Sequence, residues 1–213
     1  MNRGRCRILV ATRSVPKLAE LRTLLGDLPV DVVSLADLEL EPTAAEEELE
    51  RFETFAENAA AKARYFHRLT GLPAIADDSG LCVDALGGEP GVRTKRFAPE
   101  ELAARWGRDA ANNRYLLERL GRVPEEERGA EYRCALAGVA RGDPFMVEGR
   151  VRGRITAEPR GKGGFGYDPL FYYPPAGGTF AELPPAVKRE HSHRAEAIRG
   201  LRPWVEALVE GGG

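Results

Sequence analysis

Four segments of the chain carry side chains whose types and spacing suit phosphate and metal chemistry. They run from Thr12 to Lys17, from Glu46 to Lys62, from Asp77 to Gly80 and from Gly161 to Arg194. Hydroxyls, cations and paired carboxylates occur together in this set. Such a combination favours a nucleotide handled together with a divalent metal ion.

Two adjacent carboxylates, Asp77 and Asp78, follow the apolar run that begins at Pro73, a pattern typical of a buried strand that ends in DDSG. Carboxylates at such a place are costly unless a positive charge lies nearby. Oxygen ligands of this kind suit magnesium. Because successive strand residues point to opposite sides, at most one of the pair should face a given site. A capped turn leading out of the strand is the alternative.

The segment from Thr12 to Lys17 follows the first apolar run and leads into a helical pattern. Helix N-termini beyond the carboxyl ends of strands attract anions through their free N–H groups and the helix dipole. Thr12, Ser14 and Lys17 would add two hydroxyls and one cation to such a nest. The sequence therefore allows either a phosphate site or an ordinary capped turn with a surface lysine.

Polar side chains recur every four residues in the next segment, at Glu50, Thr54, Asn58 and Lys62. A continuous helix from about Pro42 to Leu69 would place them along one stripe. For most glutamates of this stretch a solvated helix face is the simpler interpretation. Lys62 differs, because it lies in the alanine-rich sequence AAAKA, where small neighbours permit close packing.

The C-terminal third contains two further signals. GKGGFG satisfies G-x-G-x-x-G, but Tyr167-Asp168-Pro169 does not open a helix, so a dinucleotide-binding fold is rejected. Ser192-His193-Arg194 stands at the start of the last helical pattern, where basic side chains oppose the helix dipole by roughly 0.3–1 kcal/mol each. An electron-rich ligand would explain them, and a solvent-exposed helix start is the simpler alternative.

The elements that must position these segments alternate between strand and helix patterns. Strands are predicted at Arg7–Ala11, Val30–Leu35, Pro73–Asp77, Leu81–Leu86, Glu131–Ala140 and Phe145–Ile155, the last two as a hairpin. Helices are predicted from about Pro16, which suits a first turn, over Pro42–Leu69, over Pro99–Leu120 and from near Ser192 onwards. The last of them should carry its apolar residues inward: Ala195, Ile198, Leu201, Val205 and Leu208. Without an internal repeat or a long linker, the chain is expected to form a single α/β domain over residues 1–213.

Composition narrows the function classes. With 213 residues, 43% hydrophobic and 30% charged, the chain is typical of a globular protein, and a net charge of -2 argues against duplex nucleic acid as a partner. The three cysteines form no C-x-x-C pair and the histidines no H-E-x-x-H pair, which disfavours a disulfide scaffold and common zinc sites. The apolar runs are too short for a signal peptide or a membrane span. We therefore expect a cytoplasmic protein with no membrane partner.

In their identity and order, the motifs of this chain resemble those of the inosine triphosphate pyrophosphatase family (XTP/dITP diphosphatases), whose members remove deaminated purine nucleotides. The matching segments are ATRSVPKLAEL, TFAENAAAKA, ADDSGLCVDALGGEPGV, GGFGYDPLF, TFAEL and KREHSHRA. The resemblance implies a long twisted mixed sheet with flanking helices, two lobes around a nucleotide-binding cleft, and a homodimer. It also implies Mg²⁺-dependent hydrolysis of ITP, dITP and XTP to the monophosphate and pyrophosphate.

The same resemblance implies roles for the matching residues. Asp78 would be the catalytic carboxylate and a magnesium ligand, with Asp77 as a minority alternative and Glu50 as the second ligand. The expected substrate-binding residues are Thr12, Arg13, Ser14, Val15, Pro16, Lys17, Lys62, Ser79, Phe165, Gly166, Tyr167, Asp168, Lys188, His193 and Arg194. Only five of the 31 basic residues are lysines, and Lys17, Lys62 and Lys188 all fall in this set.

The chain departs from the family pattern at three positions. Relatives usually have asparagine at Ser14, often glycine at Pro16, and often a small residue at Lys95. The sequence also allows two alternative functions. One is a Maf-like pyrophosphatase of pyrimidine or modified nucleotides, and the other is a purine nucleotide-binding protein without catalytic activity. The SHR and FGYD segments favour the purine enzyme.

Overall fold

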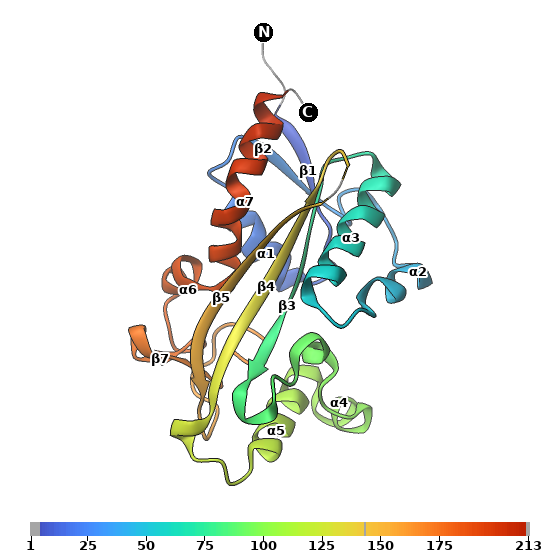
Figure 1. Cartoon of the computed structure of the whole chain (residues 1–213). Coiled ribbons are helices and arrows are strands. Elements are labelled where there is room, and N and C mark those ends of the chain that lie inside the picture. The colour runs from blue at the N-terminus through green and yellow to red at the C-terminus, as the bar shows by residue number, and fades with distance from the viewer. Residues whose placement is uncertain (1–4, 143, 212–213) are drawn as a thin grey trace. The chain divides into compact units, whose positions relative to one another are not determined.

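The computed structural model describes residues 5–142 and 144–211, in which seven strands form one sheet in the order β2-β1-β3-β4-β5-β6-β7 (Figure 1). The strands are β1 (Cys6–Val10), β2 (Val30–Ser34), β3 (Ala74–Val83), β4 (Gly129–Val139), β5 (Phe145–Ile155), β6 (Phe171–Tyr173) and β7 (Gly178–Thr179). β1 pairs in parallel with β2 and β3, whereas β6 pairs antiparallel with β5 and β7. The predicted mixed α/β sheet is therefore confirmed.

Helices connect and flank these strands. They are α1 (Val15–Leu25), α2 (Ala44–Glu47), α3 (Phe55–Thr70), α4 (Glu100–Trp106), α5 (Arg108–Leu120), α6 (Pro185–His191) and α7 (His193–Glu210). Five short 3₁₀ helices complete the described elements: η1 (Glu48–Glu50), η2 (Asp84–Leu86), η3 (Gly91–Arg96), η4 (Glu125–Glu127) and η5 (Pro174–Ala176). None of the helices in the described residues has the length and apolar character that a membrane span requires.

The chain divides into two compact units. The first comprises the described residues of Met1–Asp78, Cys134–Gly149 and Arg194–Gly213, and the second comprises Ser79–Arg133 and Arg150–His193. Strands β3, β4 and β5 contribute residues to both. The chain passes from one unit to the other after Asp78 and again after His193. These two boundaries lie inside the motifs DDSG and SHR.

The first unit has a core on each face of its part of the sheet. Alternate residues of β1 point to opposite faces, so Ile8 packs with Leu21 of α1 and Leu201 of α7, whereas Leu9 packs with Ala63 of α3. Figure 1 shows α7 and α3 on opposite sides of these strands. The inward face predicted for the last helix is confirmed, because Ala195, Ile198, Leu201 and Val205 of α7 are buried and Leu208 is partly buried against the same core.

The second unit has its own apolar core. Leu81 and Val83 of β3 pack there with Leu116 of α5 and with two aromatic residues, Phe171 and Phe180. The rings of Phe171 and Phe180 lie 5.0 Å apart in a tilted arrangement. Tyr167 and Leu170 belong to the same core, and they come from the segment between β5 and β6 that contains the glycine-rich loop.

The structure corrects the predicted break in the third strand. β3 runs without interruption from Ala74 to Val83 and is buried along its whole length. The alternative of a capped turn at DDSG is therefore wrong. Of the strand predicted at Leu81–Leu86, only Leu81–Val83 are strand, and they are buried in β3, whereas Asp84–Leu86 form η2. The physical reason is that Leu81 and Val83 pack into the core, and that both carboxylates have cationic partners, so the strand need not turn out into solvent.

Both long predicted helices are interrupted. The stretch from Pro42 to Leu69 forms α2 and η1 and then breaks, and α3 starts afresh where the Thr54 side chain accepts a hydrogen bond from Glu57 N. The stretch from Pro99 to Leu120 is split at Gly107, whose φ of 80° no helical residue adopts. β4 and β5 are neighbours, as the predicted hairpin requires, but Asp143 of its turn lies outside the described residues.

Candidate active site

Asp77 lies at the centre of a buried charge cluster in the first unit. Its Oδ2 is 2.8 Å from Lys17 Nζ and 3.5 Å from Arg194 Nε. Arg194 also donates to Glu20 Oε2 at 2.8 Å. Burial alone would raise the pKa of Asp77, but Lys17 and Arg194 outweigh burial and hold that pKa well below its ordinary value. Asp77 is therefore ionised across the physiological range.

This cluster corrects two sequence interpretations. Lys17 is not a surface lysine, because it is only 4% exposed and its ammonium group contacts a carboxylate. The start of α7 is not solvent-exposed either, since Ser192, His193 and Arg194 are all buried. Arg194 tolerates its place at a helix N-terminus because two carboxylates offset its charge. Glu20, the second of them, was not singled out from the sequence.

Asp78 belongs to a second cluster. Asn58 Nδ2 donates to Asp78 Oδ2 at 3.0 Å, and Lys62 Nζ lies 3.5 Å from Asp78 Oδ1. The same ammonium group donates to Glu50 Oε1 at 2.9 Å and to the backbone oxygen of Asp77 at 2.6 Å. Burial would lower the pKa of Lys62, but the carboxylates of Asp78 and Glu50 raise it above its ordinary value. Lys62 is therefore a cation held between two carboxylates.

The alternation expected for adjacent strand residues is confirmed. The side chain of Asp77 meets cations from α1 and α7, whereas that of Asp78 meets polar groups from α3. Only one carboxylate of the pair can thus take part in the cluster that contains Glu50.

Glu50 does not lie on one continuous helix with Asn58 and Lys62, as the predicted helical stripe requires, because it belongs to η1 and α3 begins only at Phe55. The chain turns between η1 and α3, and Asn58 holds the turn: its Oδ1 accepts from Phe52 N at 3.0 Å, and its Nδ2 donates to Phe52 O at 3.3 Å. Glu50 therefore meets Lys62 because the chain folds back. Asn58 is buried on the alanine-rich face of α3. A polar side chain buried on such a face needs hydrogen-bond partners, and this need is the feature of the sequence that could have pointed to its role.

The residues predicted to bind phosphate in the loop between β1 and α1 differ in their exposure and in their contacts. Thr12 Oγ1 accepts from Ser14 N at 3.2 Å, and the Ser14 hydroxyl makes no capping bond to α1. Val15 is 76% exposed, and Pro16 occupies the first turn of α1, as predicted. Arg13 instead donates to Glu46 at 2.8 and 3.0 Å, which anchors the loop to α2.

Asp168 organises a third cluster, which lies in the second unit. Its Oδ2 accepts from Phe165 N at 2.9 Å and from Lys188 Nζ at 2.6 Å. Tyr132 OH donates to Asp168 Oδ1 at 3.4 Å. The Lys188 ammonium group also lies 4.5 Å from the centroid of the Phe165 ring. No helix follows Tyr167 and Asp168, which agrees with the rejection of a dinucleotide fold.

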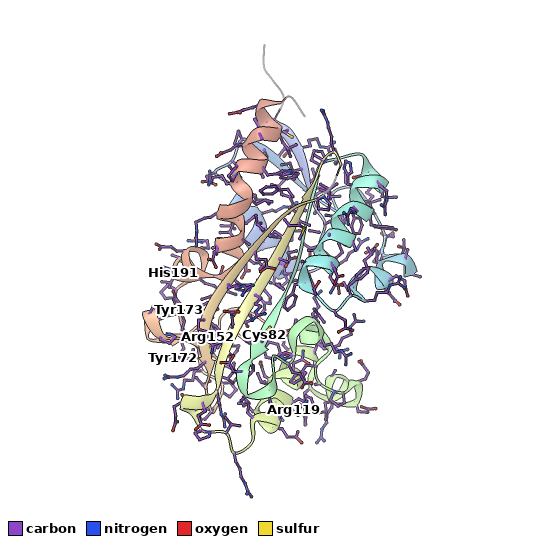
Figure 2. All side chains as sticks on the ribbon, in the orientation of Figure 1. Cys82, Arg119, Arg152, Tyr172, Tyr173 and His191 are labelled. Carbon is purple, nitrogen blue, oxygen red and sulfur yellow. The ribbon has the colours of Figure 1, made fainter. Side chains whose placement is uncertain are left out.

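His193 extends this cluster. Its ring stacks on Tyr132 at a centroid distance of 4.8 Å and an interplanar angle of 10°. The other histidines lie elsewhere: His191 packs near Tyr173 at 5.9 Å (Figure 2), and His67 Nδ1 is 2.7 Å from Leu72 O. Tyr132 was missed, because a tyrosine in a strand pattern is no different from a core residue in the sequence.

The Asp78 cluster has the donors that a magnesium ion uses. The carboxylates of Glu50 and Asp78 both contact Lys62 Nζ, so they converge on one point. Among the residues that the structure describes, no group of three or more His, Cys, Asp or Glu side chains could hold a metal. Magnesium commonly binds through one or two carboxylates together with substrate phosphates, so this pair fits it. Ser79 follows Asp78 on the same buried strand.

The sequence profile of the Ham1 family matches residues 8–204, which include all three clusters. The chain belongs to the Ham1 family. It is 49% identical over 212 residues to a dITP/XTP pyrophosphatase of Nocardia farcinica, a match that covers 96% of this chain and 97% of the relative. It is 48% identical over 201 residues to a dITP/XTP pyrophosphatase of Burkholderia pseudomallei, covering 93% and 92%.

Solved Ham1 structures share the fold. The HAM1 protein of Coxiella burnetii superposes with a TM-score of 0.80 at 37% sequence identity, covering 96% of this chain and 99% of that protein. The resemblance found in the motifs is thereby confirmed over nearly the full length of the chain.

Proposed function

We propose that this Ham1 protein hydrolyses the deaminated purine nucleoside triphosphates ITP, dITP and XTP to the monophosphate and pyrophosphate. The names of its Nocardia and Burkholderia relatives support this substrate class. The observation that carries the proposal is the cluster in which the buried Asp78 and Lys62 meet the half-buried Glu50. Such a set of carboxylates and a lysine suits the attack of water that breaks the bond between the α- and β-phosphates and releases pyrophosphate.

In this proposal Glu50 and Asp78 would hold one Mg²⁺ ion, which when bound would polarise the phosphate oxygens of the substrate. Lys62 keeps the two carboxylates together in the free protein and offsets charge on the departing pyrophosphate. Asp78 orients and deprotonates the attacking water. Thr12, Ser14 and the N–H groups that open α1 bind phosphate oxygens, with Lys17 as the nearby cation.

The contacts favour Asp78 over Asp77 as the base. Lys17 and Arg194 hold the pKa of Asp77 far below neutrality, and a carboxylate so strongly stabilised in its charged form is a poor proton acceptor. Asp77 instead keeps Lys17 and Arg194 in place. In this role it organises the phosphate-binding loop without meeting the water.

The Asp168 cluster would recognise the base and sugar. Hypoxanthine and xanthine present O6 as an acceptor, whereas adenine presents an amino donor. Lys188 and His193 would donate to O6, and ATP would leave these buried donors without partners. Phe165 offers its ring for stacking. Arg194 acts through its contacts with Asp77 and Glu20, which occupy its guanidinium group.

The proposal includes a cytoplasmic homodimer that binds neither nucleic acid nor membranes. Light scattering on the purified protein should give a mass twice the 23.3 kDa of one chain.

One assay tests the proposed activity. The protein is incubated with Mg²⁺ and separately with ITP, XTP, GTP, ATP, UTP or TTP, and released pyrophosphate is measured. We expect pyrophosphate from ITP and XTP far above the other nucleotides. Preferential release from UTP or TTP would favour the Maf-like alternative, and release from none would favour a nucleotide-binding protein without catalytic activity.

A further inference from the structure

Two side chains of helix α5 form hydrogen bonds with the backbone of Gly166, and α5 lies outside the sequence motifs described above. Asp109 Oδ2 accepts a hydrogen bond from Gly166 N at 2.8 Å. Asn113 Nδ2 donates to Gly166 O at 2.9 Å. Asp109 and Asn113 are four residues apart on α5, so they lie one turn apart on the same face. Both backbone polar groups of one loop residue are therefore bound by one helix.

Gly166 needs such support. Its φ of 62° lies in the left-handed region, which glycine adopts without strain but which also leaves it free to adopt other conformations. It stands between Phe165, whose ring lies beside Lys188, and Asp168, which accepts from the same ammonium group. A shift of the Gly166 peptide would therefore displace both groups that face Lys188.

The next residue of the loop is anchored through the same helix. Tyr167 OH donates to Thr94 O at 2.9 Å, and Asn112 Nδ2 donates to the same oxygen at 3.3 Å. Asn112 is buried and lies beside Asn113 in the sequence. Residues of α5 thus hold Gly166 directly and Tyr167 through η3.

We propose that Asp109 and Asn113 are positioning residues that fix the Phe165–Asp168 loop for the purine base and so set base selectivity. This inference rests on the proposed function. Asp109 is solvent-exposed, where one hydrogen bond adds little to the stability of a fold. Its effect lies in the placement of the base-binding groups, because small displacements of such groups are costly to recognition.

The test compares Asp109→Ala and Asn113→Ala with the wild-type protein, using ITP and ATP as substrates. We expect kcat/KM for ITP to fall about five- to tenfold in each variant, as loss of one hydrogen bond to the loop predicts. The loss should lie mainly in KM, with kcat within about twofold, because a contact made equally before and during the reaction affects binding alone. Activity on ATP should change little, so the ITP/ATP selectivity falls.

Two control variants sharpen the comparison. Asp109→Asn keeps an oxygen that can accept from Gly166 N and should retain most of the selectivity. Glu118→Gln alters an exposed carboxylate on the same helix and should leave both activities unchanged. An equal loss on ITP and ATP, or a lowered Tm with unchanged selectivity, would show that Asp109 and Asn113 act only on the fold, and would overturn the inference.

Hydrogen exchange tests the loop without relying on catalysis. Deuterium uptake of the peptide that contains Gly166 should rise in Asp109→Ala and stay at the wild-type level in Glu118→Gln. Unchanged uptake in Asp109→Ala would overturn the inference, whatever the activity. If the wild-type protein hydrolyses no nucleotide but uptake rises as expected, the proposed function fails while the attachment of the loop to α5 stands.

Discussion

Asp77 and Asp78 are neighbours in the chain, yet their side chains have different surroundings. Asp77 meets Lys17 and Arg194, and Asp78 meets Asn58 and Lys62. Removal of the charge should therefore have different consequences at the two positions. At position 77 it leaves two buried cations with less compensation, and at position 78 it leaves Lys62 still paired with Glu50.

This difference gives a paired prediction. Asp77→Asn should lower the free energy of unfolding by roughly 3–5 kcal/mol, the usual cost of breaking a buried ion pair from one side. Asp78→Asn should fold nearly as stably as the wild type but lower kcat by about 10²–10⁴-fold, as loss of a general base does. Urea unfolding and pyrophosphate release measure the two effects. Near-normal turnover in Asp78→Asn would exclude it as the base.

At the scale of elements, the packing of α7 on the sheet depends on a glycine in β4. A Cβ added at Gly138 would lie 2.8–2.9 Å from three ring atoms of Trp204, closer than side chains approach. Gly138 thus lets the indole lie directly on the strand. The contact sets how closely the C-terminal helix packs on β4 within the first unit.

Gly138→Ala should therefore destabilise the protein by about 1–3 kcal/mol through overpacking. Thermal unfolding of the single variant measures the cost. The same substitution in a Trp204→Phe background should cost less, because the smaller ring leaves room for the methyl group. Equal costs in the two backgrounds would show that Trp204 is not the cause.

At the scale of the whole molecule, the three polar clusters are divided between the two units. The first unit contains the charge clusters of Asp77 and Asp78, and the second contains the cluster of Asp168 with Lys188 and His193. The central carboxylate of each cluster, Asp77, Asp78 or Asp168, has a lysine partner within its own unit. The folded state should therefore form without its substrate or metal.

Removal of metal tests this view. A chelator should abolish pyrophosphate release, since the proposed reaction requires Mg²⁺, but should change the free energy of unfolding by less than about 1 kcal/mol. The reason is that Lys62 contacts both Glu50 and Asp78 and compensates one of their two negative charges when no metal is bound. Activity should return when Mg²⁺ is added back. A large fall in Tm on chelation would mean that the metal holds the fold together.

The sequence by itself determined the family, the mixed α/β class and the segments that supply the three polar clusters. Short motifs such as ADDSGL and SHR can be recognised in the sequence because glycine, paired carboxylates and clustered cations are rare in ordinary strands and helices. The inward face of α7 followed from helical spacing alone. The alternation of Asp77 and Asp78 followed from the geometry of any strand.

Only the tertiary structure decided which charges meet. The break before Thr54 brings Glu50 back to Lys62, and no spacing rule shows that reversal. Arg194 and Glu20 are separated by 174 residues, and Asp109 and Gly166 by 57, so their partners depend on packing. Continuation of β3 through Asp77 and Asp78 was decided in the same way, because burial of a charge is favourable only once distant cations have been brought beside it.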